Sequence, residues 1–500
     1  MLISGPSGPN DRTGIWLYSI AGRTFRLLRD GAHKAVPSPN GSSIAFISAI
    51  DELWVMGANG EDAKRIVPSV KGYSVERIQW SPDGQRLATL RSHRGYDEAL
   101  LESRDLQGGS ATVILSDPRL RNFCWAPDGR IVFARLETPV EASANIWEIQ
   151  TNPSTMQPSG EPQRLTNWAG FILQDLSPTA DGKLIAFVRK SDQSDVYVGD
   201  LEAGGFQLNF TRRLTLDDRM DWPGGWLRDA NTVLFFSNRS GHFDIFKQSV
   251  SDRTPGEIIA SPEEKRAPQL TPDGSWILYL SWPNTNGSLP SGSGRLMRIP
   301  VSGGTPESVF EVKGYPGSAQ VPRERWLPSA RGYPDFRCPS LSALSRPCVL
   351  GEANQDQVVF SAFDPIQGRK GDLARLDLDP SDSFWDLSPD GSRIAFGKFE
   401  VSGSQIRILD LAGGEPRVVE VRGWNHVTSV GWSADGRSLF ATNWSSVAGS
   451  ILHVALNGET RLLHRAAGMT LERPLPSPDG RYLVYGDVIT TSNAWMIEIH

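Results

Sequence analysis

Short runs of alternating apolar and polar residues recur along the whole chain. Clear examples are 52–56 (ELWVM) and 145–149 (NIWEI). Such alternation places one face of a strand in a core and the other toward solvent, whereas an amphipathic helix needs a period of about 3.6 residues. No long stretch shows the helical period. The pattern therefore predicts an all-β protein.

A turn signal of the form (Ser/Thr/Ala)-Pro-Asp-Gly separates many of these runs. Clear copies begin at Ser81, Ala126, Thr271, Ser388 and Ser477; weaker copies lie at 38–41, 180–182 and 433–436, and eroded ones at 228–231 and 354–357. Proline presets φ, the Asp carboxylate bonds to the local backbone, and Gly tolerates a positive φ. Each motif therefore predicts a tight hairpin between two strands.

The spacing of the motifs defines the repeating unit. Gly41, Gly84 and Gly129 are 43 and 45 residues apart, and Gly436 and Gly480 are 44 apart. A period of roughly 40–45 residues is typical of a four-stranded propeller blade. We therefore predict a β-propeller built of four-stranded blades.

The repeat resembles the WD40-like (PD40) propellers found in TolB and in tricorn and prolyl-oligopeptidase-type proteins. The segment 237–246, SNRSGHFDIF, resembles the second-to-third-strand connection of a TolB blade, and the resemblance covers nearly the whole chain. A narrower similarity, carried by SNAWMIEI and RLTNWAGF, is to propellers fused behind bacterial membrane-bound Ser/Thr kinases or winged-helix regulators. The resemblance implies the fold but not the chemistry, because propellers carry many unrelated functions.

The two ends of the chain suggest how the blades are grouped. Residues 1–6 look like a second strand without a first before it, so we expect a fragment whose upstream part is absent, or a first blade that borrows its inner strand. At the other end, the strands expected at 481–487 and 493–499 are not followed by a fourth strand. Counting seven motifs back from Asp479 reaches Asp181, so we expect 162–167 (PQRLTN) to complete the last blade.

This arithmetic predicts two tandem propellers. Residues 162–500 would form a seven-bladed, TolB-like ring, and residues 1–161 the blades of a first, incomplete propeller. The alternative is one large ring of ten or eleven blades. An irregular insertion at 311–352 contains Cys338 and Cys348, which would form either a disulfide or two free thiols. Without a CxxC or a nearby His cluster we expect no zinc site, and we predict no metal and no cofactor.

Composition excludes several partners. The net charge is −6 and no basic run stands out, which argues against nucleic acid. No stretch approaches the roughly 18 apolar residues of a membrane span, and the N-terminus lacks a signal-peptide pattern. A disulfide would imply an oxidising compartment, so we favour an extracytoplasmic (periplasmic) location, with the cytoplasm as the alternative.

One set of residues suggests a binding surface. Second-to-third and fourth-to-next-first connections emerge on the same face of a propeller, and they carry large aromatic, Arg and His side chains of the kind that supplies binding energy. The candidates are Trp168, Trp222, Arg239, His242, Trp282, Trp424, His426 and Trp444. The alternative is that each Trp covers the rim of its own blade.

Signatures of catalysis are missing from the sequence. There is no G-x-S-x-G elbow and no H-R-D or D-F-G kinase motif. We therefore predict a protein that is not an enzyme: a binding or scaffold module for a protein, peptide or glycan, acting as the sensor part of a larger signalling protein. The alternative is a propeller glycosidase or lyase, which would need two channel carboxylates roughly 5–10 Å apart.

Overall fold

The computed structural model describes residues 1–6, 13–93, 98–137, 143–152, 155–283, 293–314, 334–340, 345–354, 357–378, 383–398, 404–445 and 448–499. This part of the chain is all-β, with antiparallel strands, one short 3-10 turn at Ala203–Gly205 and no α-helix. None of its helices is long and apolar enough to cross a membrane. The chain divides into two compact units: Met1–Ser191 with Thr491–His500 form unit 1, and Asp192–Thr285 with Pro290–Thr490 form unit 2.

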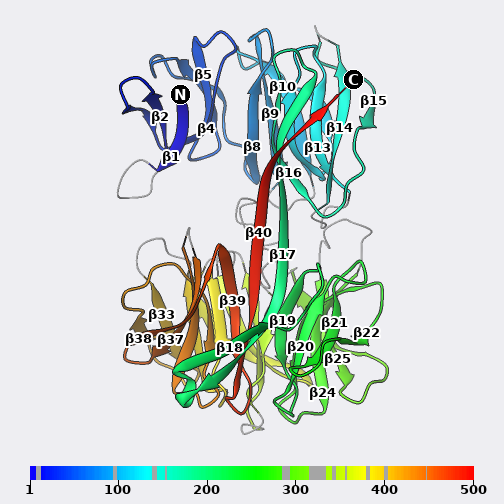
Figure 1. Ribbon diagram of the computed structural model, residues 1–500, viewed down its shortest axis with the longest axis vertical. Coiled ribbons are helices and arrows are strands. Elements are labelled where there is room, and N and C mark those ends of the chain that lie inside the picture. The colour runs from blue at the N-terminus through cyan, green and yellow to red at the C-terminus, as the bar shows by residue number, and fades with distance from the viewer. Residues whose placement is uncertain are drawn as a thin grey trace. The chain divides into compact units, whose positions relative to one another are not determined.

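Unit 1 is a series of sheets that follow one another along the chain (Figure 1). The first holds β1 (Leu2–Pro6), β2 (Thr13–Ser19) and β3 (Thr24–Asp30). The next holds β4 (Ala32–Pro37), β5 (Ser43–Ser48), β6 (Leu53–Gly57) and β7 (Lys64–Val67). Then come β8 (Tyr73–Trp80), β9 (Arg86–His93), β10 (Ala99–Asp105) and β11 (Thr112–Ser116), followed by β12 (Leu120–Trp125), β13 (Ile131–Leu136), β14 (Ala144–Thr151) and β15 (Pro158–Arg164). β16 (Ile172–Pro178) pairs with β17 (Leu184–Glu202), which pairs with β40 (Tyr482–Glu498).

Unit 2 contains five consecutive four-stranded sheets in its described residues. Their strands are β19 (Asp221–Trp226), β20 (Thr232–Ser237), β21 (Asp244–Ser249), β22 (Gly256–Ile259); β23 (Glu264–Leu270), β24 (Trp276–Trp282), β25 (Ser293–Pro300), β26 (Glu307–Lys313); β27 (Asp335–Arg337), β28 (Cys348–Asn354), β29 (Gln357–Asp364), β30 (Gly368–Leu376); β31 (Ser383–Leu387), β32 (Arg393–Lys398), β33 (Gln405–Asp410), β34 (Arg417–Glu420); and β35 (Val427–Trp432), β36 (Ser438–Trp444), β37 (Ala448–Ala455), β38 (Thr460–Ala467).

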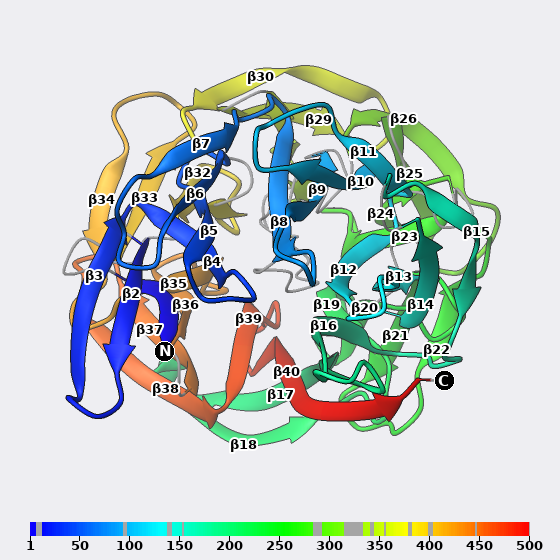
Figure 2. The same cartoon turned by 90° about the horizontal axis from the view of Figure 1, so that it is seen from above.

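A sixth sheet closes unit 2 into a ring. It combines β39 (Met469–Pro476) and β40 with β17 and β18 (Gln207–Arg213), so its four strands come from chain segments far apart in sequence. β39 contacts β35 on one side and β19 on the other, which completes the circuit of first, or inner, strands. Figure 2 shows the sheets of this unit following one another around a centre. The arrangement of four-stranded antiparallel sheets is that of a β-propeller.

The ring closes differently from our expectation. β15 is the outer strand of its own sheet, where Arg164 lies opposite Trp147 on β14, so 162–167 cannot complete the last one. The units divide at Ser191/Asp192 instead of 161/162, and the described part of unit 2 holds six sheets, not seven. The physical reason is local: β15 follows β14 after a short connection, and closing a short loop costs less entropy than a long one. Of the predicted insertion at 311–352, residues 315–333 and 341–344 lie outside the described residues.

The Pro-Asp-Gly motif forms the predicted turn between an inner strand and the next strand. In the copy at 81–84, the Ser81 hydroxyl donates to Asp83 Oδ1 at 2.6 Å, the Gln85 N–H donates to the same oxygen at 3.0 Å, and the Gly84 N–H donates to the Ser81 carbonyl at 2.9 Å. The bonds from Ser81 and then Gln85 to this carboxylate lower the pKa of Asp83. The same pattern recurs at 38–43, 179–184, 271–276, 388–393, 433–438 and 477–482.

Polar side chains tie several inner strands to the next. Gln79 on β8 accepts the Trp125 N–H of β12 at 2.8 Å, and Asn122 on β12 accepts the Leu176 N–H of β16 at 3.2 Å. In unit 2, Asp386 on β31 accepts the Trp432 N–H of β35 at 2.9 Å. Ser429 on β35 likewise accepts the Arg473 N–H of β39 at 3.1 Å. These bonds satisfy backbone donors that face the neighbouring sheet and have no strand partner there.

The turn glycines provide a test of local strain. Gly480 has φ +73°, and an added Cβ would meet nothing closer than Ala434 Cβ at 3.8 Å, so the backbone conformation alone opposes a side chain. Gly480→Val should lower the free energy of unfolding by roughly 1–3 kcal/mol, because a β-branched residue resists positive φ. Chemical denaturation measures the change. Gly371→Val, at a glycine without positive φ and with open space around it, is the matched control and should be nearly neutral.

Candidate functional site

The eight predicted surface residues have different environments. Trp168 belongs to unit 1, where it is half-buried and its ring lies 5.6 Å from that of Phe187. The other seven belong to unit 2. Trp222 and Trp282 are completely buried, and the Trp282 Nε1–H donates to the Gly314 carbonyl at 2.8 Å. Neither ring is accessible to solvent in this structure, so these two tryptophans are not part of an exposed surface.

Arg239 is the centre of a network of buried charges in unit 2. It lies in the connection between β20 and β21, and its guanidinium lies 3.0 Å from both Asp217 and Asp221. Its Nε–H donates to the Ser237 hydroxyl at 2.9 Å, and its plane lies 4.6 Å from the centre of the Phe246 ring. The first residues of β19 and of the 238–243 connection are therefore fixed to each other.

His242 lies beside another buried carboxylate of the same sheet, Asp244. Its Nε2 lies 3.1 Å from Asp244, a fully buried carboxylate at the start of β21 that also accepts from Lys265 Nζ at 2.5 Å. Lys265 in turn donates to the carbonyls of Ser261 and Glu263. This lysine is itself buried, so its charge is compensated by Asp244 and by backbone dipoles.

Three further buried carboxylates of unit 2, Asp195, Asp221 and Asp487, could not be singled out from the sequence. Asp195 on β17 accepts from Arg213 at 2.6 Å, and Asp487 lies on the neighbouring strand β40. Burial, reinforced for Asp487 by the charge of Asp195, raises the pKa of Asp195 to about 6 and that of Asp487 to about 7. Burial also raises the pKa of Asp221. No local motif marks these residues, because ring closure brings β17, β19 and β40 together.

A second charged cluster lies on the inner strands of unit 2. Arg337 on β27 lies 2.8 Å from Asp335 and 3.1 Å from Asp386 on β31, and Arg473 on β39 lies 3.9 Å from Asp335. Burial raises the pKa of the Asp386 carboxyl, while Arg337 opposes this shift. Both carboxylates are thus occupied by an arginine. Among the described residues no group of three or more His, Cys, Asp or Glu side chains has the geometry to hold a metal ion.

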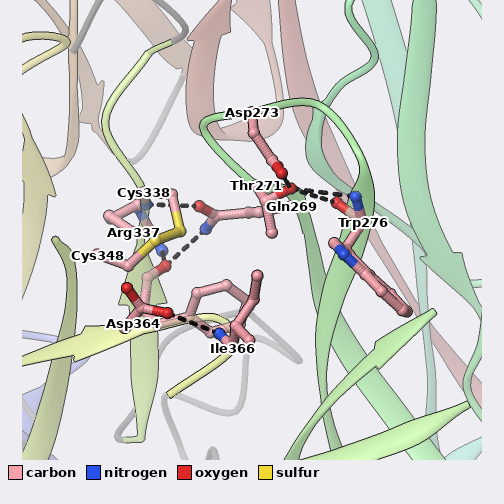
Figure 3. The surroundings of a disulfide bond; sticks show 10 residues. Gln269, Thr271, Asp273, Trp276, Arg337, Cys338, Cys348, Asp364 and Ile366 are labelled. Carbon is pink, nitrogen blue, oxygen red and sulfur yellow. Dashed lines mark hydrogen bonds between the residues drawn. A yellow bond between two sulfur atoms is a disulfide. The ribbon is translucent and has the colours of Figure 1, made fainter. Parts of the chain in front are cut away.

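Cys338 and Cys348 form a disulfide beside this cluster (Figure 3). It joins the end of β27 to the start of β28. Gln269 on β23 faces it: its Nε2–H donates to the Phe336 carbonyl at 2.6 Å and its Oε1 accepts the Cys338 N–H at 3.3 Å (Figure 3). The disulfide therefore fixes a short inner strand that is also tied to its neighbour. The third cysteine, Cys124, is buried, and burial raises its thiol pKa to about 12, which makes it unreactive.

The exposed part of the predicted surface is centred on Trp444. Its side chain is 43% exposed, the Trp444 N–H donates to the His426 carbonyl at 3.1 Å, and the two rings meet edge to face at 6.3 Å. Trp424 is half-buried against the core, with Arg465 5.9 Å from its ring. We call Trp424, His426, Trp444 and Arg465 the Trp444 surface. It combines an accessible indole with groups that can donate hydrogen bonds or carry positive charge.

Several solved structures are similar to parts of this chain. No protein-family model and no curated protein matches the chain. A solved structure of a putative TolB from Agrobacterium tumefaciens is 16% identical and covers 61% of this chain and 90% of its own, with a TM-score of 0.24. The propeller domain of the Trilobed protease from Pyrococcus furiosus is 16% identical, covering 62% and 91%, with a TM-score of 0.27. An oligogalacturonate lyase from Vibrio parahaemolyticus is 11% identical, covering 61% and 92%, with a TM-score of 0.30.

The buried charge network gives a pH-dependent prediction. A carboxyl whose pKa lies above its unfolded value of about 3.9 is held as the neutral acid by the fold, so its stabilising effect is present at low pH and is lost as pH rises toward the folded pKa. For Asp487, with a folded pKa of about 7, the loss should fall between about pH 4 and pH 7. Asp487→Asn should therefore stabilise the protein at pH 8 by roughly 1–3 kcal/mol and have little effect at pH 4.

Thermal and denaturant unfolding of the wild type and Asp487→Asn at both pH values measure this effect. Asp83→Asn is a control at an exposed turn aspartate whose pKa the fold lowers. This substitution should destabilise the protein at neutral pH, the opposite of Asp487→Asn. Equal stability of Asp487→Asn and the wild type at pH 8 would contradict the raised pKa.

Proposed function

We propose that the protein is a non-catalytic binding module whose unit 2 presents the Trp444 surface to a peptide or protein ligand. The observation that carries this proposal is the partly exposed Trp444 ring, braced by His426 at the end of a rigid sheet. Large aromatic side chains in such positions dominate binding energy at protein interfaces. The narrower role, as the sensor part of a larger signalling protein, is part of this proposal.

The charges of unit 2 support binding over catalysis. A glycosidase needs two carboxyl groups that face a substrate in one pocket. Asp195, Asp221 and Asp244 are almost completely buried, and each is held by an arginine or lysine. Groups bound in this way fix loops and strands. They are poorly placed to protonate a leaving group or to attack a sugar.

Selection of a phage-displayed random peptide library on the intact chain tests the proposal. Peptides that bind the wild type should bind Trp444→Ala more weakly by about 2 kcal/mol or more, with unchanged far-UV circular dichroism. Trp495→Ala removes a similarly exposed indole of unit 1, 48% exposed, and should leave binding unchanged.

Three results would contradict the proposal. Peptides that bind Trp444→Ala as tightly as the wild type would place the ligand elsewhere. Enrichment of no peptide, together with binding of soluble oligosaccharides, would also contradict it, since the ligand would then be a glycan. Unfolding of Trp444→Ala would show that the ring serves packing.

A further inference from the structure

The end of the sheet at which Trp444 lies has no negative charge of its own. Residues 421–471, which form β35–β38 and their connections, contain four arginines and two carboxylates, Asp435 and Glu459. Both carboxylates lie in hairpin turns, one between β35 and β36 and the other between β37 and β38. These turns lie at the end of the sheet opposite the β36–β37 connection, because successive hairpins of an antiparallel sheet turn at alternate ends. The seven residues of β36 separate the two ends by about 20 Å.

Arg465 places a positive charge at the Trp444 end of this sheet. It lies near the end of β38, opposite Ser450 on β37, and its side chain is exposed. Its guanidinium lies 5.9 Å from the centre of the Trp424 ring. No ion pair joins Arg465 to a carboxylate in the described part of the chain. Arg213, Arg239 and Arg337 of the same unit, by contrast, each hold an aspartate.

The 421–426 connection links Arg465 to Trp444. Its Trp424 ring, beside Arg465, packs on the core between this sheet and β31–β34. The Asn443 side-chain amide donates to the Asn425 carbonyl, and the Trp444 N–H donates to the His426 carbonyl at 3.1 Å. These two hydrogen bonds fix the connection across the end of β36. The aromatic side chains and the neighbouring arginine are therefore held on one rigid frame.

The adjacent sheets add no exposed excess of negative charge in their described segments nearest in sequence to this surface. In the preceding sheet, the exposed Glu420 at the end of β34 is followed two residues later by the exposed Arg422. In the following sheet, Glu472 of β39 and Asp487 of β40 are buried. A ligand that touches Trp444 thus meets the charge of Arg465 without a carboxylate of the protein already bound to it.

We propose that the Trp444 surface selects an acidic peptide, in which an Asp or Glu side chain binds Arg465 and an apolar or aromatic side chain packs on the Trp444 indole. This inference rests on the proposed function and adds the chemical class of the peptide. A guanidinium pairs with a carboxylate through two parallel N–H···O bonds, and complementary charge sets partner choice. Since β36 and β38 are two strand spacings apart, about 10 Å, the two ligand side chains should lie about three residues apart in an extended peptide.

Selection of a phage-displayed random peptide library on the intact chain, compared between variants, tests this inference. Peptides enriched on the wild type should carry Asp or Glu two to four positions from an apolar or aromatic residue, well above the frequency in the unselected library. Selection on Arg465→Gln should lose the acidic enrichment and keep the apolar one. Arg437→Gln removes an exposed arginine of the β35–β36 turn, at the opposite end of the same sheet, and should select the same peptides as the wild type.

Fluorescence anisotropy with one enriched peptide, labelled with fluorescein, measures the pairing itself. Replacing its acidic residue by the corresponding amide should weaken binding to the wild type about fivefold, and Arg465→Gln should have the same effect on the original peptide. The amide peptide should bind the wild type and Arg465→Gln equally, because the two changes remove the same contact.

The outcomes separate this inference from the proposed function. Enriched peptides that need Trp444 but show no acidic excess, or that bind Arg465→Gln as tightly as the wild type, overturn the acidic ligand and leave the binding module intact. Peptides none of which depends on Trp444 overturn both. Equal weakening by Arg437→Gln and Arg465→Gln also overturns the inference, because the effect would then come from the net charge of the chain.

Discussion

At several junctions a backbone N–H of one inner strand donates to a polar side chain of the preceding inner strand, and these hydrogen bonds hold the neighbouring sheets in place. Sheets of a propeller meet face to face through apolar side chains, and apolar packing alone does not fix how far one sheet slides over its neighbour. Asn122, Asp386 and Ser429 remove that freedom, because each satisfies a donor that would otherwise be buried without a partner. The Pro-Asp-Gly turns then place the beginning of the second strand at an equivalent position in each sheet.

The same constraint explains where charge is tolerated. Where the inner-strand position carries a carboxylate, as at Asp386, an arginine from the neighbouring strand compensates it. At the other end of unit 2, Arg239 and Lys265 compensate the carboxylates at the starts of β19 and β21. Function is left to side chains that this framework does not use. Trp444 is the clearest of these in unit 2.

Local features of the fold could be predicted from the sequence, but ring closure could not. The turn motifs at Ser81 and Ser477 consist of contiguous residues and recur at a regular spacing. The strands, hairpins and propeller class can therefore be predicted from them. The last sheet of unit 2 joins β39 and β40 to β17 and β18, and no local pattern records that pairing. Asp195 and Asp487 meet only through it. The burial of Trp222 and Trp282 could not be predicted for a related reason: a strand-end tryptophan looks the same in sequence whether it faces solvent or the next sheet.

Hydrogen–deuterium exchange at the junction between β12 and β16 tests this account most directly. In the wild type, the Leu176 amide should exchange slowly because it donates to Asn122. Asn122→Ala should accelerate exchange in 172–178 by about fivefold to tenfold, the effect of losing one hydrogen bond of about 1 kcal/mol. Exchange in the 126–129 turn, closed by its own Gly129 to Ala126 bond, should stay as it was. Unchanged exchange in 172–178, or equal acceleration throughout unit 1, would contradict the claim that these side chains join the sheets.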